Sequence, residues 1–330
     1  MDQSQNLYTK IFKISERNFD QVALEIFKYQ SKNNLIYKKY LKLLGINVER
    51  VRRTREIPFM PIDFFKDFKV MSGNWEPETT FLSSGTGGQQ RSKHHIRNLP
   101  FYKNVSLRIF NQYYGDPKQY HIFALLPSYN NVLQNSSLIH MVKFLIDASG
   151  SDLSGFYFDD LENLKKNLQL AKSRKGRIIL LGVSFALLDF GEKLPTNLDA
   201  SIIIETGGMK GQRIEITRKE LHSRLKSSFN VKKIHSEYGM TELLSQAYSK
   251  KNGIFSTPQW MRIVIRDIYD PYNTVTLGKT GGLNIIDLAN IDSCSFIETQ
   301  DMGVLHINRY FEVIGRLDNS EIRGCNLLIS

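Results

Sequence analysis

The sequence alternates short apolar runs with longer segments of helical periodicity, and this alternation is what most constrains the fold. Three apolar runs are typical of buried strands: residues 121–127 (HIFALLP), 177–185 (RIILLGVSF) and 200–208 (ASIIIETGG). Strands separated by helical segments are the pattern of stacked β-α units and a largely parallel sheet. The sequence therefore predicts an α/β fold.

Helix-start signals support this interpretation. DDLENLKKNLQLAKSRKG opens with Asp159 and Glu162 at capping-box spacing, and TRKELHSRLKSSF repeats the device with Thr217 and Glu220. Residues 14–46 carry apolar side chains at helical spacing around SKNN. This spacing predicts two amphipathic helices whose aromatic and aliphatic stripe belongs to the core.

The pattern changes near Ser256 to short runs separated by turns, as in MRIVIRDIYDPYNTVTLGKTGGLNIIDL, which indicates a smaller β-rich lobe. With 330 residues, of which 41% are hydrophobic, the chain is long enough for one large or two ordinary domains. We expect residues 1–255 to form a helical N-terminus with an α/β core. Residues 256–330 are expected to form the β-rich lobe.

Composition excludes several classes of protein. The net charge of +11 comes from basic residues spread along the chain, which favours anionic substrates or an acidic partner, and we expect no nucleic-acid ligand. No signal-peptide core and no membrane-spanning apolar run is visible, so we expect a cytoplasmic protein. Two cysteines, Cys294 and Cys325, are too few for a disulfide framework or a zinc site. The oligomeric state stays open.

Residues 81–96, FLSSGTGGQQRSKHHI, place glycines and hydroxyl side chains before a basic tail. One interpretation is a solvated loop, because Gly and Ser clusters mark turns. The other is a phosphate cradle, in which backbone NH groups and hydroxyls surround an anion. The Walker A pattern is absent, since no Gly-Lys-Ser/Thr closes the loop. For His94 and His95, which could assist phosphate binding or act as bases, we favour an exposed pair on a basic strand.

Further motifs stand where strands are expected to end, the place where open α/β sheets bind ligands. IETGGMKGQR leaves the apolar run 201–204 through two glycines, and IHSEYGMTELLSQAY follows an expected strand at 231–234. FIETQDMGVLHI and FEVIGRLDNSEIRGCNLLIS contribute Asp301, Arg316 and Asp318 near the end of the chain. Each motif alone has a structural explanation as a turn, a core position or an ion pair. Together and in this order, the four motifs are a specific signal.

At these four motifs, residues 81–330 resemble the adenylate-forming superfamily, which includes acyl-CoA synthetases and peptide-synthetase adenylation domains. Within it, IPFMPIDFFKDFKV, LPSYNNVLQNSSLIHMV, SGFYF and IETGGMKGQR are most similar to the LuxE-type acyl-protein synthetase family of bacterial fatty-acid reductase. The resemblance implies an N-terminal adenylate-forming domain with mostly parallel sheets flanked by helices, and a smaller β-rich lobe ending at a hinge-like motif. It implies no C-terminal lid domain, because the sequence stops at Ser330.

The resemblance also implies ATP and Mg²⁺ as cofactors and assigns roles residue by residue. The β- and γ-phosphates would be held by Ser83, Ser84, Gly85, Thr86, Gly87 and Gly88, with Arg91 where the family usually has lysine. The adenine would lie against Gly207 and Gly208 and stack on Tyr238, which Gly239 follows. Thr241 would touch the α-phosphate and Glu242 would hold magnesium. Asp301 would bind the ribose hydroxyls, with Arg316 nearby.

Some positions depart from the superfamily pattern. Gly87 replaces a threonine, Gln90 a proline and Arg91 a lysine, so loop rigidity and phosphate contacts are expected to differ. The lysine that longer relatives carry in their C-terminal domain has no counterpart here. In the resembling family, the acyl group passes to a cysteine near the C-terminus and then to a partner reductase. Cys325 matches that cysteine in placement, and a small buried residue in a last strand is the alternative.

The resemblance thus implies that a carboxylic acid, fatty or aromatic, is activated as an acyl-adenylate and transferred to a protein thiol, on this chain and then on a partner protein. Residues 126–130 and 154–158 would wall the acid pocket. A carboxylate-CoA ligase of the phenylacetate-CoA ligase kind shares the same nucleotide motifs. A non-catalytic interaction module that keeps the fold is the third alternative.

Overall fold

The architecture comes from a computed structural model, which describes residues 3–84, 90–126, 135–207, 213–214, 216–270 and 273–317. Within them, five strands form the parallel half of one large sheet, in the order β8-β7-β6-β4-β5. They are β4 (Tyr120–Leu125), β5 (Gly155–Phe156), β6 (Arg177–Val183), β7 (Ile202–Thr206) and β8 (His235–Tyr238). This half confirms the parallel sheet that the sequence predicts.

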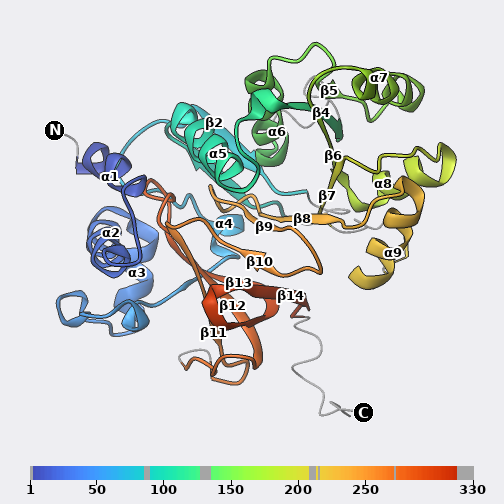
Figure 1. The fold of residues 1–330 in the computed structure, drawn as a ribbon. Coiled ribbons are helices and arrows are strands. Elements are labelled where there is room, and N and C mark those ends of the chain that lie inside the picture. Colours follow the sequence, from blue (N-terminus) through green and yellow to red (C-terminus); the bar gives the residue numbers. More distant parts are fainter. Residues whose placement is uncertain are drawn as a thin grey trace.

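Helices cover both faces of the parallel half, so its inner strands β4, β6 and β7 consist mainly of buried apolar residues. All six residues of β4 are buried. Figure 1 shows α6 on one side of β4 and β6, and α7 and α8 on the other. These helices are α5 (Leu99–Tyr114), α6 (Ser137–Ser149), α7 (Leu161–Ser173), α8 (Ser184–Lys193) and α9 (Arg218–Phe229).

The sheet continues without a break into an antiparallel half, because β9 pairs with β8. The order runs on as β9-β10-β14-β13-β12-β11. The strands are β9 (Ala247–Ser249), β10 (Phe255–Ser256), β11 (Met261–Arg266), β12 (Thr280–Asp287), β13 (Phe296–Leu305) and β14 (Phe311–Arg316). The short strand β1 (Met60–Pro61) adds to β13, while β2 (Thr79–Leu82) and β3 (Lys93–Ile96) form a separate hairpin. The β-rich segment after Ser256 is thereby confirmed, and the expected domain boundary falls inside β10.

The N-terminal helices α1 (Gln3–Ile11), α2 (Phe19–Asn33), α3 (Leu35–Leu43) and α4 (Phe64–Asp67) pack beside the antiparallel half (Figure 1). The side-chain amide of Gln30 donates to the carbonyl of Asn290 at 2.8 Å. The amide of Asn34 donates to the carbonyl of Ser293 at 2.9 Å. Phe27 meets Phe296 edge to face, so the apolar stripe belongs to the core as predicted. Single 3₁₀ turns occupy Val48–Arg50, Thr54–Glu56, Pro117–Gln119 and Ile307–Arg309.

Several element boundaries differ from the sequence predictions. Thr217 does cap α9, but α7 is capped by Asp160 rather than Asp159, since Asp160 accepts from the backbone NH of Asn163 at 3.0 Å. The strand expected at 231–234 is wrong, and β8 begins at His235. Pairing with β7 on one side and β9 on the other makes a strand of the polar segment HSEY, which propensity alone does not favour.

Among the described residues, no helix combines the length and the apolar character needed to cross a membrane.

Candidate active site

The carboxyl ends of β7 and β8 place two of the predicted motifs side by side. Thr206 is in register with Glu237, so Gly207 and Tyr238 follow at the same edge of the sheet. The Thr206 hydroxyl donates to the Glu237 carboxylate and joins the two strand ends. Gly207 has a φ of 65°, a left-handed conformation that suits glycine and turns the chain away from the sheet. Gly208 lies outside the described residues.

Tyr238, Asp301 and Arg316 form one cluster. The Tyr238 hydroxyl donates to Asp301 Oδ2 at 2.7 Å, and Arg316 Nε lies 3.4 Å from Asp301 Oδ1 across the β13–β14 pair. Burial, the Asp301 charge and the hydrogen bond to Asp301 together hold the pKa of Tyr238 well above its usual value. The ring of Tyr238 is fixed edge to face against Phe255 and Phe311. The Arg316 side chain is 85% exposed, so its pairing with Asp301 contributes little stability.

A second cluster joins Glu242 to the foot of the glycine loop. Glu242 is 5% exposed, and burial raises the pKa of its carboxyl, while a hydrogen bond with Ser92 acts in the opposite direction. Arg316 also lowers the pKa of Glu242 through its charge. Tyr238 and Glu242 stand in one short segment at the end of β8, and the charge of Arg316 acts on the pKa of both, so the two clusters belong to one site.

The two ends of the glycine loop are tied together. The backbone NH of Ser83 donates to the Ser92 carbonyl at 3.1 Å, and the Ser92 NH donates to Ser83 Oγ at 2.9 Å. The Gln90 amide donates to the Lys66 carbonyl at 2.6 Å, while Ser84 and Arg91 are exposed. Gly85, Thr86, Gly87 and Gly88 lie outside the described residues. The loop therefore starts and ends beside Glu242, although its glycines are not described.

His94 corrects the prediction of an exposed histidine pair. It is 1% exposed, and its Nδ1 donates to the carbonyl of Thr241 at 2.8 Å. Its Nε2 lies 3.0 Å from Ser293 Oγ and accepts from that hydroxyl. Burial lowers the pKa of His94 to about 4, which keeps the ring neutral, and the Thr241 carbonyl, which can only accept, places the ring proton on Nδ1. His94 therefore sets the path of the backbone between Gly239 and Glu242 and does not face solvent; His95, also on β3, is half-buried.

Sequence reasoning did not find the polar network beneath the strand ends. Ser184 donates to Glu205 Oε2 at 3.1 Å, and His222 Nε2 lies 3.4 Å from Glu205 Oε1. Burial raises the pKa of Glu205, but hydrogen bonds with His222 and Ser236 outweigh it and leave that pKa below its usual value. The sequence signal for this network was a glutamate inside the apolar run 201–206, because a buried carboxylate needs hydrogen-bond or charge partners.

The protein groups at this site suit a magnesium ion that phosphates also bind better than a metal ion bound by protein side chains alone. Among the described residues, no group of three or more His, Cys, Asp or Glu side chains forms a metal cage. Mg²⁺ commonly takes one or two carboxylates and completes its shell with phosphate oxygens and water. Glu242 supplies one buried carboxylate beside the loop, and a bound cation would offset the cost of its burial. The residues present therefore fit Mg²⁺ that arrives with a phosphate ligand.

Solved structures share this fold. An open conformation of 2-hydroxyisobutyryl-CoA ligase in complex with 2-HIB-AMP and CoA superposes with a TM-score of 0.67 at 12% identity, covering 91% of this chain and 70% of the ligase. ATP-bound MatB from Rhodopseudomonas palustris gives a TM-score of 0.52 at 14% identity, covering 72% of this chain and 47% of MatB. An ATP-bound RpMatB-BxBclM chimera gives 0.53 at 14% identity, with 76% of this chain matched. The chain spans only 50% of the length of that chimera.

The fold is therefore that of the adenylate-forming enzymes. Among curated proteins, none matches this sequence. The family model of the acyl-protein synthetase LuxE matches residues 12–330, which is nearly the whole chain. The chain belongs to the LuxE acyl-protein synthetase family.

Proposed function

We propose that this protein uses ATP to activate a carboxylic acid as an acyl-adenylate and then transfers the acyl group to a cysteine thiol. Membership of the LuxE acyl-protein synthetase family supports the reaction class. The observation that carries the proposal is the convergence of Tyr238, Asp301 and Glu242 at the foot of the glycine loop. Tyr238 and Glu242 belong to the segment at the end of β8, whereas Asp301 belongs to β13 and the loop follows β2, so three separate parts of the chain meet here.

Each part of the nucleotide has a matching group in this arrangement. The Tyr238 ring, held by two phenylalanines, offers a face for the adenine. Asp301 has two carboxylate oxygens that can accept hydrogen bonds from the ribose hydroxyls. These bonds would replace its present contacts with the Tyr238 hydroxyl or with the exposed Arg316. The loop from Ser83 to Ser92 would enclose the terminal phosphates, with Arg91 as an exposed cation beside them. Gly207 would leave room for the base beside the strand end.

Chemically, a carboxylate oxygen of the acid attacks the α-phosphorus, and the bond to pyrophosphate breaks. Both the incoming carboxylate and the departing pyrophosphate are anions, so the site must neutralise negative charge and hold the reactants in line. Glu242 would hold Mg²⁺, which when bound polarises the phosphate oxygens. Thr241, whose backbone His94 fixes, would donate its hydroxyl to the α-phosphate.

The second half-reaction needs a thiol whose thiolate attacks the acyl carbonyl while AMP leaves. Cys294 does not suit this role: it is fully buried, its Sγ donates to the Phe296 carbonyl at 3.4 Å, and burial raises its pKa to about 12. Cys325 lies outside the described residues, and we propose it as the acceptor on the placement that the family resemblance implies. A partner protein would then receive the acyl group.

The acid is proposed to be fatty or aromatic. Phe158 and Phe185 follow the carboxyl ends of β5 and β6, where they meet edge to face with centroids 6.2 Å apart. Both rings are only partly buried, so part of each remains free for an apolar ligand. Apolar rings beside the strand ends suit an alkyl or aryl tail better than a charged one.

The experiment that tests the adenylation step is acid-dependent exchange of labelled pyrophosphate into ATP. Glu242→Gln removes the proposed magnesium ligand at nearly constant volume, and we expect exchange to fall by about 100-fold or more. Glu312→Gln on β14 makes the same chemical change at a carboxylate that pairs with His306, so its exchange rate should stay near wild type. Equal rates in the two variants would overturn the assigned role of Glu242. No exchange with any acid by the folded wild-type protein would overturn the adenylation itself.

The same assay separates thiol transfer to protein from transfer to CoA. Release of AMP that appears only after CoA is added would favour a carboxylate-CoA ligase. Release of AMP with protein alone, limited to one turnover, is the outcome that our proposal predicts.

A further inference from the structure

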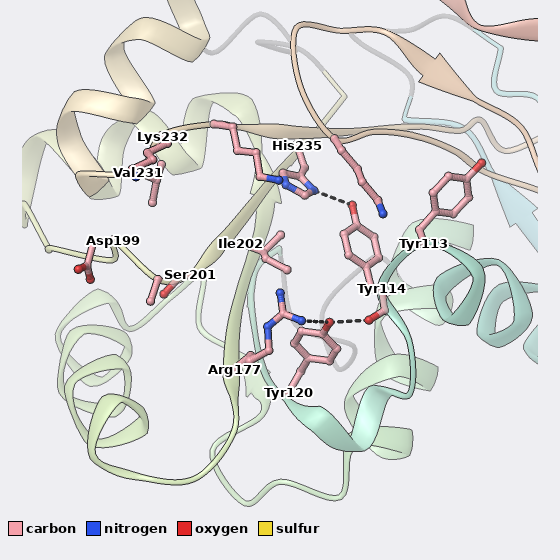
Figure 2. A pocket seen from close by; sticks show the side chains of 13 residues that line it. Tyr113, Tyr114, Tyr120, Arg177, Asp199, Ser201, Ile202, Val231, Lys232 and His235 are labelled. Carbon is pink, nitrogen blue, oxygen red and sulfur yellow. Dashed lines mark hydrogen bonds between the residues drawn. The ribbon is translucent and has the colours of Figure 1, made fainter. Parts of the chain in front are cut away.

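A pocket opens at the opposite edge of the parallel sheet from the candidate active site. Its volume is about 360 Å³, and it is lined where β4, β6, β7 and β8 begin. Figure 2 shows Arg177 and His235, from two of these strands, together with Tyr114 at the end of α5 and Tyr120 at the start of β4. Nothing in the nucleotide site reaches this edge, because the nucleotide motifs follow the carboxyl ends of the strands.

The lining is strongly basic. Four cationic side chains line the pocket, Arg177, Lys232, Lys233 and Lys250, against one carboxylate, Asp199. Throughout the described part of the chain, none of the four forms an ion pair with an acidic side chain. Four cations that share a pocket with a single carboxylate repel one another, and a bound anion would relieve that repulsion.

His235 provides a second and independent sign of a ligand. It is 3% exposed, and its Nδ1 lies 3.2 Å from the Tyr114 hydroxyl, whereas its Nε2 is buried without a hydrogen-bond partner in the described structure. Burial and the neighbouring Lys233, Lys250 and Arg177 lower the pKa of His235 to about 4, so the ring is neutral. We assign the ring proton to Nε2, with Tyr114 as the donor to Nδ1, and this assignment leaves Nε2 as a buried donor without a partner among the described residues.

The tyrosines hold this arrangement rigid. Arg177 Nη1 donates to the Tyr120 hydroxyl at 3.1 Å, and the Tyr120 hydroxyl donates to the Tyr114 carbonyl at 2.5 Å (Figure 2). The Tyr114 ring stacks on His235 with centroids 5.7 Å apart. Arg177 and His235 are therefore positioned before any ligand arrives, which lowers the entropy cost of binding.

We propose that this pocket binds a phosphate-bearing small molecule. A phosphate offers several acceptor oxygens around one compact centre, which matches an arginine fork, lysines and a neutral histidine donor approaching from different strands. The pocket is larger than a phosphate alone needs, and Asp199 and Ser201 add an acceptor and a hydroxyl to its lining. Hydroxyl groups on the remainder of the ligand would suit Asp199 and Ser201, which offer an acceptor and a hydroxyl beside the cations.

The test is a titration of the full-length protein with inorganic phosphate, followed by NMR at the imidazole nitrogens of its seven histidines. The His235 signals are assigned by their loss in His235→Gln. We expect a saturable shift of the His235 signals. In Lys233→Met/Lys250→Met, the phosphate affinity at His235 should fall by about tenfold or more, since charge-assisted bonds are lost.

A matched control removes the same charge elsewhere. Lys166→Met/Lys172→Met on α7 should bind phosphate at His235 as tightly as the wild type does, because these side chains are exposed and lie outside the pocket. Equal weakening in both double variants, or no saturable shift at His235, would overturn the site. Citrate binding at His235 more tightly than phosphate would overturn the phosphate class in favour of carboxylates. None of these readings depends on the proposed adenylation activity.

Discussion

Tyr238 is the residue on which the nucleotide assignment can be judged most directly, because its ring and its hydroxyl do different things. The hydroxyl donates to Asp301 at 2.7 Å, while the ring rests edge to face on Phe255 and Phe311. The sequence motif indicates an aromatic residue at this position, but it does not show that the ring and the hydroxyl make separate contacts. The structure supplies it, since Asp301 is 63 positions further along the chain.

Replacing Tyr238 by phenylalanine and by alanine separates the two contributions. We expect Tyr238→Phe to bind ATP within about threefold of wild type, because the ring remains. We expect Tyr238→Ala to lose about 10- to 100-fold in affinity, as stacking of a base on an aromatic ring contributes about 1–3 kcal/mol. Calorimetric titration with ATP measures both. Equal losses in the two variants would show that the ring does not stack on the base.

At the scale of elements, β3 and the segment after β8 depend on each other. The backbone of β3 continues from the glycine loop, and His94 on β3 binds the Thr241 carbonyl and the Ser293 hydroxyl. A strand pattern in residues 93–96 was visible in the sequence, but its burial was not. Lys93 and His95 suggest solvent exposure, whereas long-range packing against residues 241 and 293 buries the side chain between them.

This linkage predicts a dependence of stability on pH. His94 has a pKa of about 4 in the folded protein and near 6.5 when unfolded, so the unfolded chain takes up a proton first as the pH falls. Stability is therefore full above pH 6.5 and decreases as the pH falls toward 4. By pH 4.5 the loss from this group should be about 2 kcal/mol. Urea unfolding at pH 7 and pH 4.5 measures it.

His94→Asn is the matched variant, because an amide can still donate to the Thr241 carbonyl but does not titrate. Its free energy of unfolding should change less between the two pH values than that of the wild type, by the same 2 kcal/mol or so. His235 also has a lowered pKa in the fold and contributes to the decrease in both proteins, so only the difference between them reports on His94. Identical decreases would contradict a buried, neutral His94.

At the scale of the whole molecule, the sequence predicted the parallel half of the sheet and the β-rich segment because apolar periodicity is a local property. The single continuous sheet was not predictable in the same way. It depends on β9 pairing with β8 and on β14 pairing with both β10 and β13. These contacts join distant segments, and short strands such as β9 and β10 carry little periodic signal of their own.

The candidate site, too, was predictable where a local motif marks it and not where distant contacts form it. Tyr238, Thr241, Glu242, Asp301 and Arg316 were identifiable as motif positions and lie together in the structure. The bonds between Ser83 and Ser92 were not identifiable, because hydrogen bonds between backbone and hydroxyl groups leave no mark on composition. For the network around Glu205 the sequence showed a glutamate inside an apolar run, but not its partners Ser184 and His222, which lie on other elements. The basic pocket at the other edge could not be predicted from the sequence for a related reason. Its cations are spread over residues 177–250 and come together only when the strands pair in the sheet.

The most direct test of the account is the intact mass of the protein after incubation with ATP, Mg²⁺ and a panel of fatty and aromatic acids. The account predicts a mass increase equal to one acid minus water, removed by hydroxylamine, present in Cys294→Ala and absent in Cys325→Ser. An adduct that persists in Cys325→Ser, or no adduct while the protein releases AMP only with CoA, would contradict acyl transfer to this thiol.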